Sequence, residues 1–254
     1  MTRAKKKGGL FSWLFRAYLR FRLRRAFDDL RILGAPSLVS HLEAQPLILA
    51  CNHVAWWDPL LLIELEHYLS ERCDVPADGY CLMDRANLQK FSFFSRLGAL
   101  GLDRSQARRG YRDLQRSAKV LSRPGTFLVI FPQGRQRPAH LPLRLKAGVS
   151  ALAAQSRAAV VPIAIRYDFL AGPRPVAHLS AGEPLYYQKE LSHSHKYLVS
   201  RLQLALSEQL RRIDEAVLNS DVMAVSLLGR QALPKDAPRS LWLKLLNQFH
   251  KGTS

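Results

Sequence analysis

Apolar runs of strand length alternate with segments of helical periodicity from about residue 46 to residue 167. In the helical segments, apolar side chains recur three or four positions apart, as they do on one face of a helix. Strands that alternate with helices usually build a sheet that is covered on both faces. We therefore expect an α/β fold with a mostly buried mixed sheet flanked by helices. The predicted strands are residues 46–51 (PLILAC), 80–83 (YCLM), 126–131 (TFLVIF) and 159–167 (AVVPIAIRY), and the predicted helices are residues 59–70, 111–122 and 145–156.

Two prolines refine these elements. Pro162 interrupts the last apolar run, and because proline cannot donate a ladder hydrogen bond, it predicts an edge strand or a bulge. Pro59 suits the first position of the helix 59–70, which makes Asp58 a candidate N-cap.

Amphipathic segments flank the alternating region on both sides. Residues 10–27 (LFSWLFRAYLRFRLRRAF) repeat aromatic and arginine positions at helical spacing. Residues 199–217 step apolar side chains by three or four and predict one long helix, and residues 240–249 (SLWLKLLNQF) are short, apolar and basic. We expect a basic amphipathic helix in 1–35, a central domain in 36–190 and a C-terminal helical extension in 191–254.

Positive charge is concentrated near the N-terminus. The chain has 254 residues and a formal net charge of +18, and nine lysines and arginines precede the first acidic residue, Asp28. Such a block typically contacts a polyanion, either nucleic acid or anionic lipid. Trp13, Phe15, Tyr18 and Phe21 are residue types that settle at the headgroup boundary of a bilayer. We therefore expect this helix to lie on an anionic membrane surface and do not expect nucleic acid; packing on the protein's own core is the alternative.

The cysteine content and the hydropathy of the chain limit where in the cell the protein is expected to lie. Cys51, Cys73 and Cys81 are odd in number and lack CxxC spacing, which favours reduced thiols over a disulfide framework or a zinc site. No apolar run approaches the roughly 18 residues of a spanning helix. Arginines interrupt the N-terminal apolar segment, so we expect it to be retained rather than cleaved as a signal peptide. The expectation is a peripheral protein on the cytoplasmic face of a membrane, without a metal or a cofactor.

The stretch ILACNHVAWWDP, residues 48–59, carries the candidate chemistry. His53 follows the predicted strand, and Asp58 opens the next helix. Five steps along a regular helix rotate by about 140°, so the two side chains would meet across a strand-to-helix turn. There Asp58 would accept a hydrogen bond from one ring nitrogen and leave the other free to take a proton from a substrate hydroxyl. Without catalysis, Asp58 would be only a helix cap and His53 an ordinary polar group at a strand end.

The motif NHVAWWD (52–58) resembles the His-x4-Asp motif of the glycerolipid acyltransferases, the lysophosphatidate (1-acylglycerol-3-phosphate) acyltransferase-like family. Further blocks similar to those of the family follow in the expected order, and the resemblance covers roughly residues 40–190. They are LGALGLDR (97–104), FPQGRQRP (131–138), LKAG (145–148) and VVPIAI (160–165).

The resemblance implies acyl transfer without an acyl-enzyme intermediate. His53 would remove the proton of an acceptor hydroxyl, which attacks the thioester of acyl-CoA or acyl-carrier protein, while Asp58 orients the ring. The acceptor would be lysophosphatidate or a lysophospholipid, with its polar head, commonly a phosphate, held by arginines and loop residues. The residues implied in binding are Arg104, Phe131, Pro132, Gln133, Gly134, Arg135 and Lys146; for Lys146, a solvated position on a helix surface is an equal alternative.

Two residues of the third block depart from the usual FPEGTRS pattern. Gln133 stands where glutamate is common, and Arg135 stands where threonine is common. An amide keeps an acceptor oxygen but loses the charge, and Arg135 with Arg137 makes the loop more positive. We expect an acceptor site that is altered rather than lost, so a lysophospholipid, a glycerol ester or another lipid alcohol joins lysophosphatidate as a candidate.

Three other interpretations stay open at the level of the sequence. Cys51 and His53, two residues apart on one face of a strand, would suit a thiol acyltransferase with a covalent intermediate. A non-catalytic basic protein that binds membrane or nucleic acid would account for the charge. An inactive member of the family would account for Gln133.

Overall fold

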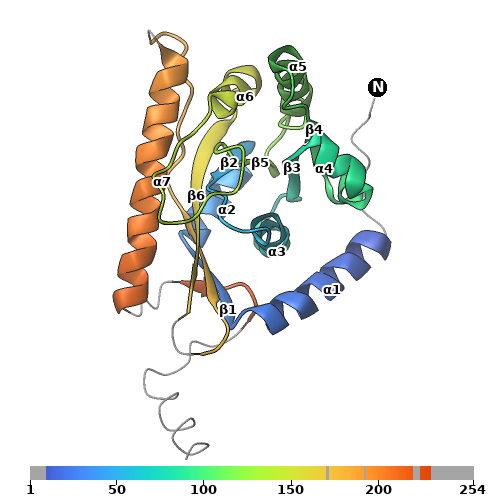
Figure 1. The fold of residues 1–254 in the computed structure, drawn as a ribbon, viewed down its shortest axis with the longest axis vertical. Coiled ribbons are helices and arrows are strands. Elements are labelled where there is room, and N and C mark those ends of the chain that lie inside the picture. Colours follow the sequence, from blue (N-terminus) through green and yellow to red (C-terminus); the bar gives the residue numbers. More distant parts are fainter. Residues whose placement is uncertain (1–9, 170–171, 192, 220–223, 230–254) are drawn as a thin grey trace, which may run out of the picture.

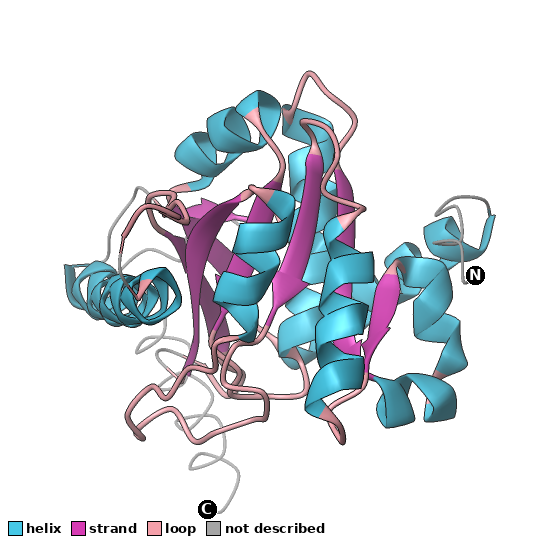
Figure 2. Cartoon of the chain, turned by 90° about the horizontal axis from the view of Figure 1, so that it is seen from above, coloured by secondary structure: helices cyan, strands magenta, loops and turns pink. Residues whose placement is uncertain are grey.

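A computed structural model describes residues 10–169, 172–191, 193–219 and 224–229. Within these residues the strands form one eight-stranded sheet with the order β4-β3-β5-β2-β6-β7-β1-β8, and helices cover both of its faces (Figures 1 and 2). The strands are β1 (Asp29–Leu33), β2 (Leu47–Cys51), β3 (Asp78–Asp84), β4 (Ala99–Leu102), β5 (Thr126–Ile130), β6 (Ala159–Asp168), β7 (Val176–Ala181) and β8 (Val225–Ser226). The helices are α1 (Leu10–Ala26), α2 (Ala35–Ala44), α3 (Asp58–Arg72), α4 (Arg85–Lys90), α5 (Ala107–Ala118), α6 (Gly148–Ser156), α7 (Ser194–Asn219) and the 3-10 helix η1 (Ser92–Leu97).

The sheet is mixed, as predicted. Strands β4, β3, β5, β2 and β6 run parallel to one another, whereas β7 is antiparallel to β6, β1 is parallel to β7, and β8 is antiparallel to β1. The carboxyl ends of the parallel strands therefore share one edge of the sheet, the edge at which open α/β folds usually bind their ligands. His53 follows β2, Phe131 follows β5 and Arg104 follows β4, so all three come from this edge.

Two apolar cores lie on opposite faces of the sheet. Leu47, Leu49 and Cys51 of β2 pack with side chains of α1, α2 and α3, and Ile48 and Ala50 pack with side chains of α5, α6 and α7. All five residues of β2 are buried because both faces are covered. This explains why the strand appears in the sequence as a continuous apolar run rather than as an alternation.

The predicted strands correspond to β2, β3, β5 and β6, and the predicted helix 59–70 corresponds to α3. The helix predicted at 111–122 is α5, which begins and ends four residues earlier, at Ala107 and Ala118, and the helix predicted from residue 145 begins at Gly148. The long C-terminal helix is α7, with Leu202, Leu206 and Ile213 buried. Residues 240–249 lie outside the described residues.

The expectation for Pro162 is half right. Strand β6 lies between β2 and β7, so Pro162 is not on an edge strand. Val160 pairs with Leu185 and Ile163 pairs with Ala181. Between these two pairs, the two residues 161–162 of β6 lie opposite the three residues 182–184 that follow β7. Pro162 falls in this irregular step, which behaves as a bulge and accommodates a residue without an N–H group.

The boundaries predicted at residues 36 and 190 do not coincide with the limits of the sheet. Strand β1 precedes residue 36 and pairs with β7, and β8 follows residue 190 and pairs with β1. Helix α7 also packs on β6 and β7. Long-range pairing of short segments thus joins parts of all three predicted regions in one α/β unit.

Candidate active site

The strand-to-helix turn begins at a buried asparagine. The side chain of Asn52 bridges to the backbone of Ile165 on β6: its Nδ2 donates to the carbonyl oxygen at 2.9 Å, and its Oδ1 accepts from the amide at 2.7 Å. These two bonds continue the pairing of β2 with β6 by one residue beyond Cys51. The chain is therefore anchored to the sheet directly before His53.

His53 and Asp58 are in contact across this turn. His53 Nδ1 lies 2.7 Å from Asp58 Oδ2, and the Asp58 side chain is fully buried whereas the His53 side chain is 17% exposed. A carboxylate at Nδ1 favours the tautomer with the proton on Nδ1, which leaves the Nε2 lone pair as the acceptor. Among the described residues, none forms a hydrogen bond to Nε2. The contact that the spacing predicts is thus present.

Asp58 receives further donors from the same turn and from β6. Its Oδ2 accepts the backbone N–H groups of Val54 at 2.7 Å and Ala55 at 3.0 Å, and its Oδ1 accepts the hydroxyl of Tyr167 at 2.5 Å. The helix-cap interpretation is wrong, because Asp58 is the first residue of α3 and no side chain caps this helix. The carboxylate points back toward the turn that carries His53 and stabilises its conformation.

Tyr167 is a site residue that sequence reasoning missed. It lies near the end of β6, and burial, followed by the neighbouring Asp58 carboxylate, raises the pKa of its hydroxyl, so it stays a neutral donor. Its ring stacks on Phe27 at a centroid distance of 5.7 Å. The local signal of a polar partner was the change from apolar residues to Arg166, Tyr167 and Asp168 at the end of β6.

Replacing Tyr167 by phenylalanine should remove one of the donors to Asp58 and leave its charge less compensated. We expect the free energy of unfolding to fall by about 1–2 kcal/mol and kcat to fall by roughly threefold to tenfold, since His53 keeps its own contact with Asp58. Chemical denaturation and steady-state kinetics measure the two effects. Tyr197→Phe, at an exposed position of α7, is the control; equal behaviour of the two variants would contradict a role for Tyr167 in holding Asp58.

The loop after β5 holds His53 rather than leaving it free. The ring of Phe131 stacks on the imidazole at a centroid distance of 4.3 Å and an angle of 27°. The backbone N–H of His53 donates to Oε1 of the buried Gln133 side chain at 2.8 Å. The backbone N–H of Arg137 donates to the backbone carbonyl oxygen of His53 at 2.8 Å. The observed contacts of Phe131 and Gln133, both predicted to bind substrate, are therefore with His53. A glutamate could accept the same bond as Gln133, so the substitution preserves this contact.

Other predicted residues gather at the same loop. Gly134 has a φ of +73°, which favours glycine, and a Cβ added there would lie 3.1 Å from Lys146 Cε. The Lys146 N–H donates to the carbonyl oxygen of the buried residue Pro132 at 2.8 Å. The structure thus brings Lys146 over the loop at Gly134, and Arg135 is exposed beside it.

Arg104 lies farther from His53. It follows β4, which is separated from β2 by β3 and β5; three strand spacings amount to about 14 Å. Its Nη1 is 3.9 Å from Asp84 Oδ2, and its side chain is 41% exposed. Arg104 therefore shares the sheet edge with the His53–Asp58 pair but is not packed against it.

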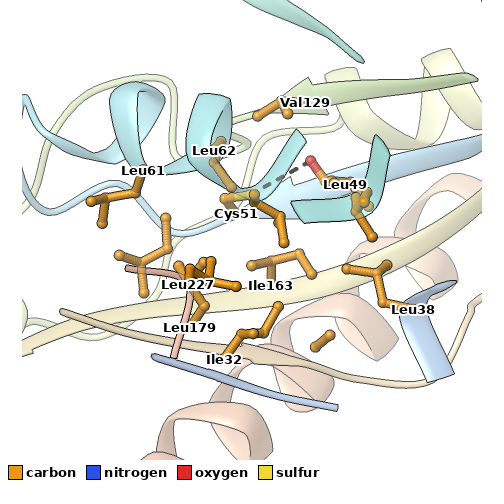
Figure 3. Close-up of a cluster of buried hydrophobic side chains, with 14 of the residues drawn as sticks. Ile32, Leu38, Leu49, Cys51, Leu61, Leu62, Val129, Ile163, Leu179 and Leu227 are labelled. Carbon is orange, nitrogen blue, oxygen red and sulfur yellow. Dashed lines mark hydrogen bonds between the residues drawn. The ribbon is translucent and has the colours of Figure 1, made fainter. Parts of the chain in front are cut away.

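The interpretation of Cys51 as a nucleophile is wrong. Its side chain is fully buried and lies among leucine and isoleucine side chains, including Leu62 and Ile163 (Figure 3). Burial raises the pKa of the thiol well above its ordinary value, so it stays protonated and unreactive. Cys51, Cys73 and Cys81 are all free thiols.

Comparison with known proteins places this site in a family. The family model described as Acyltransferase matches residues 36–166, just over half of the chain, and includes His53, Asp58 and the loop after β5. A search of curated proteins finds no match. Among solved structures, the chain is similar to the crystal structure of the 1-acyl-sn-glycerophosphate (LPA) acyltransferase PlsC from Thermotoga maritima, with 17% identity, a TM-score of 0.49, and coverage of 78% of this chain and 81% of that chain. On the match of the family model, the chain belongs to the acyltransferase family.

Proposed function

We propose that this chain transfers a fatty acyl group from a thioester donor, acyl-CoA or acyl-carrier protein, to a hydroxyl of a lysoglycerolipid. The observation that supports the proposal is the 2.7 Å contact between His53 Nδ1 and the buried carboxylate of Asp58. A histidine oriented in this way keeps Nε2 as a proton acceptor, and no described residue forms a hydrogen bond to Nε2. Such a pair suits proton removal from a hydroxyl that a substrate supplies.

The reaction then needs only one proton carrier. His53 Nε2 takes the proton of the acceptor hydroxyl as its oxygen attacks the thioester carbonyl carbon. The tetrahedral intermediate collapses, the carbon–sulfur bond breaks, and the leaving thiolate takes the proton back from Nε2. Asp58 stabilises the imidazolium that exists between the two transfers.

A half-buried arginine next to His53 supports a phosphorylated acceptor. Arg137 Nε is buried, and no described residue provides it with a hydrogen-bond partner, although the Arg137 backbone contacts His53. A buried donor without an acceptor is costly, and a phosphate oxygen would satisfy it. Arg135 and Lys146 add positive charge around the same loop. We therefore propose lysophosphatidate or a lysophospholipid as the acceptor.

Replacing Arg137 by glutamine should raise KM for lysophosphatidate about tenfold, since the lost charge-assisted bond contributes on the order of 1.4 kcal/mol. KM for monoacylglycerol, which lacks a phosphate, should stay unchanged. Steady-state kinetics with both acceptors measure the difference, and Arg212→Gln on α7 is the matched control. An equal rise of KM for both acceptors would contradict phosphate recognition by Arg137.

Acyl transfer from labelled acyl-CoA and acyl-carrier protein to a panel of lipid acceptors tests the function itself. We expect an ester product with at least one donor, sequential rather than ping-pong kinetics, and no acylated protein on intact-mass analysis. Absence of transfer from both donors, or a stable acyl-protein adduct, would contradict the proposal.

Helix α1 supports a peripheral position on a bilayer. Leu19 and Leu23 are its buried residues, whereas Trp13 and Phe21 are 65% and 54% exposed. Figure 1 shows α1 at the periphery of the molecule. Within the described part of the chain, no helix is long and apolar enough to cross a membrane.

The 3-10 helix η1 extends the aromatic surface of α1. Phe93 contacts Phe15 at a centroid distance of 5.9 Å, the Arg96 guanidinium lies 5.3 Å from the centre of the Phe11 ring, and Phe91, which precedes η1, is half exposed. Aromatic side chains interleaved with arginines suit the headgroup region of an anionic membrane. We propose that α1 and η1 dock the enzyme on the cytoplasmic face of a membrane.

Replacing Trp13 and Phe21 by alanine should weaken binding to anionic vesicles at least tenfold, since each exposed aromatic ring would bury apolar area contributing on the order of 2 kcal/mol. Vesicle sedimentation measures this, with Leu204→Ala at a 69% exposed position of α7 as the control. Substitution is preferable to deletion of the helix, because Leu19 and Leu23 belong to the core. Unchanged sedimentation would remove α1 from the membrane-docking surface.

A further inference from the structure

Arginines line two cavities along the outer side of α5. A cavity of about 200 Å³ is lined by Arg85, Arg109, Arg112, Asp113 and Arg116. A second cavity of about 650 Å³ shares Arg112 and Arg116 with it, and its polar lining continues with Gln115, Lys119, Ser122 and Gln155. The shared arginines make the two cavities one groove, which we name the α5 groove.

A buried carboxylate organises the basic side chains of the α5 groove. Asp113 Oδ2 accepts the Arg85 Nη2–H at 2.6 Å and the Asp103 N–H at 2.9 Å, and Asp113 Oδ1 lies 3.6 Å from Arg116 Nη1. Asp113 is 5% exposed, so two guanidinium groups are held over a fixed anchor. No described residue pairs with Arg112, and Asp113 is the only acidic residue in the lining of either cavity.

The positive charge of the α5 groove favours binding of an anion. Asp113 pairs with Arg85 and Arg116, and Asp103 Oδ2 lies 3.9 Å from Arg109 Nη1, so two carboxylates face four arginines. Like charges held close together repel one another, and a bound anion would relieve the repulsion that remains. Guanidinium groups pair with phosphate oxygens through two parallel hydrogen bonds, which makes arginine the usual residue for phosphate recognition. Several arginines in one groove suit a ligand with several phosphate groups.

The α5 groove begins near the edge of the sheet that carries His53, at Arg85 and Arg109, and runs along α5 toward the opposite edge, where Ser122 and Gln155 line it. Arg85 directly follows β3, and α5 follows β4; α4 and α5 lie beside these strands (Figure 1). Strand β4 is three strand spacings from β2, about 14 Å. In lysophosphatidate the phosphate is attached close to the reacting hydroxyl, so it cannot lie in this groove while the hydroxyl is at His53.

We propose that the α5 groove binds the phosphorylated nucleotide end of an acyl-CoA donor. In CoA an extended pantetheine arm separates the phosphates from the thiol, so phosphates at Arg109 and Arg112, in the half of the groove nearer to the His53 edge, would leave this arm to span the distance to His53. Concave cavities fit a small ligand rather than the surface of a carrier protein. This inference rests on the proposed acyl transfer and names CoA as the donor.

Binding of CoA itself tests the α5 groove without turnover. We expect the double variant Arg109→Glu/Arg112→Glu to raise the Kd of CoA, measured by calorimetry, at least tenfold. The control is Arg201→Glu/Arg212→Glu, which makes the same change of charge at exposed positions of α7 and should bind CoA like the unmodified protein. An unchanged Kd in the α5 variant, or an equal loss in the control, would overturn the proposal.

Kinetics with a truncated donor separate phosphate binding from damage to the active site. The α5 variant should show a raised KM for acyl-CoA, with kcat and KM for acyl-pantetheine, which lacks every phosphate, unchanged. Loss of activity with acyl-carrier protein alone, or weaker binding to anionic vesicles with normal CoA affinity, would assign the groove to another partner and overturn the proposal. Failure of the unmodified protein to transfer acyl groups would contradict the proposed function instead, because the CoA affinities do not depend on turnover.

Discussion

Replacing His53 by alanine should lower kcat for acyl transfer by roughly 10³-fold, within the range that a positioned general base contributes. The imidazole is the group at this site that can both take the hydroxyl proton and return it to the leaving thiolate, and its position is fixed by Asp58, Gln133 and the Phe131 ring. The side chain is partly exposed, so its removal leaves the apolar cores intact. Steady-state kinetics with saturating donor and acceptor measure the effect.

The matched control for this prediction is His67→Ala, on the adjacent helix α3, where the ring pairs with exposed Glu71. Thermal unfolding should give similar Tm values for the two variants, which separates loss of chemistry from loss of folding. If His53→Ala kept acyl transfer near that of His67→Ala, the imidazole would not be the base, and the proposed mechanism would have to be abandoned.

Replacing Asp58 by asparagine should lower kcat by roughly 10³-fold and also destabilise the protein by about 3 kcal/mol. The buried carboxylate faces donors from His53, Val54, Ala55 and Tyr167. An amide has one acceptor oxygen and brings its own N–H donors into a cluster of donors, so at least one buried bond is lost. The imidazolium formed during transfer would also lose its counter-charge.

Chemical denaturation and kinetics together check this prediction, with Asp74→Asn at an exposed position as the control. The double variant His53→Ala/Asp58→Asn should have a kcat no lower than that of His53→Ala alone, because Asp58 is expected to act on catalysis through the ring. Additive losses in the double variant would contradict that coupling. Full activity in Asp58→Asn would show that the contact between the two residues is structural only.

The strands of the sheet differ in how far the sequence could predict them. Strands β2, β5 and β6 were predicted because burial on both faces leaves continuous apolar runs. Strands β1 and β7 were missed, since DLRIL and VAHLSA are short and mix charged or polar residues with apolar ones. Ser180 of β7 is tolerated because Gln209 of α7 accepts its hydroxyl, and Asp29 of β1 is tolerated because the hydroxyl of Ser226 donates to it.

The amino-acid sequence by itself determined the contact between His53 and Asp58, because a strand, a turn and a helix joined within six residues leave few ways for these side chains to lie. It also determined the buried sheet and the basic, aromatic face of α1. Only the tertiary structure decided that the side chain of Asn52 bonds to the backbone of β6 and that Tyr167 of β6 bonds to Asp58. It also decided that Gln133 accepts the backbone N–H of His53 and that Arg85 bonds to Asp113 among the arginines of α5. These contacts join residues between 28 and 113 positions apart. Local periodicity carries no information about which strands become neighbours, so such partners emerge only once the order of the sheet is known.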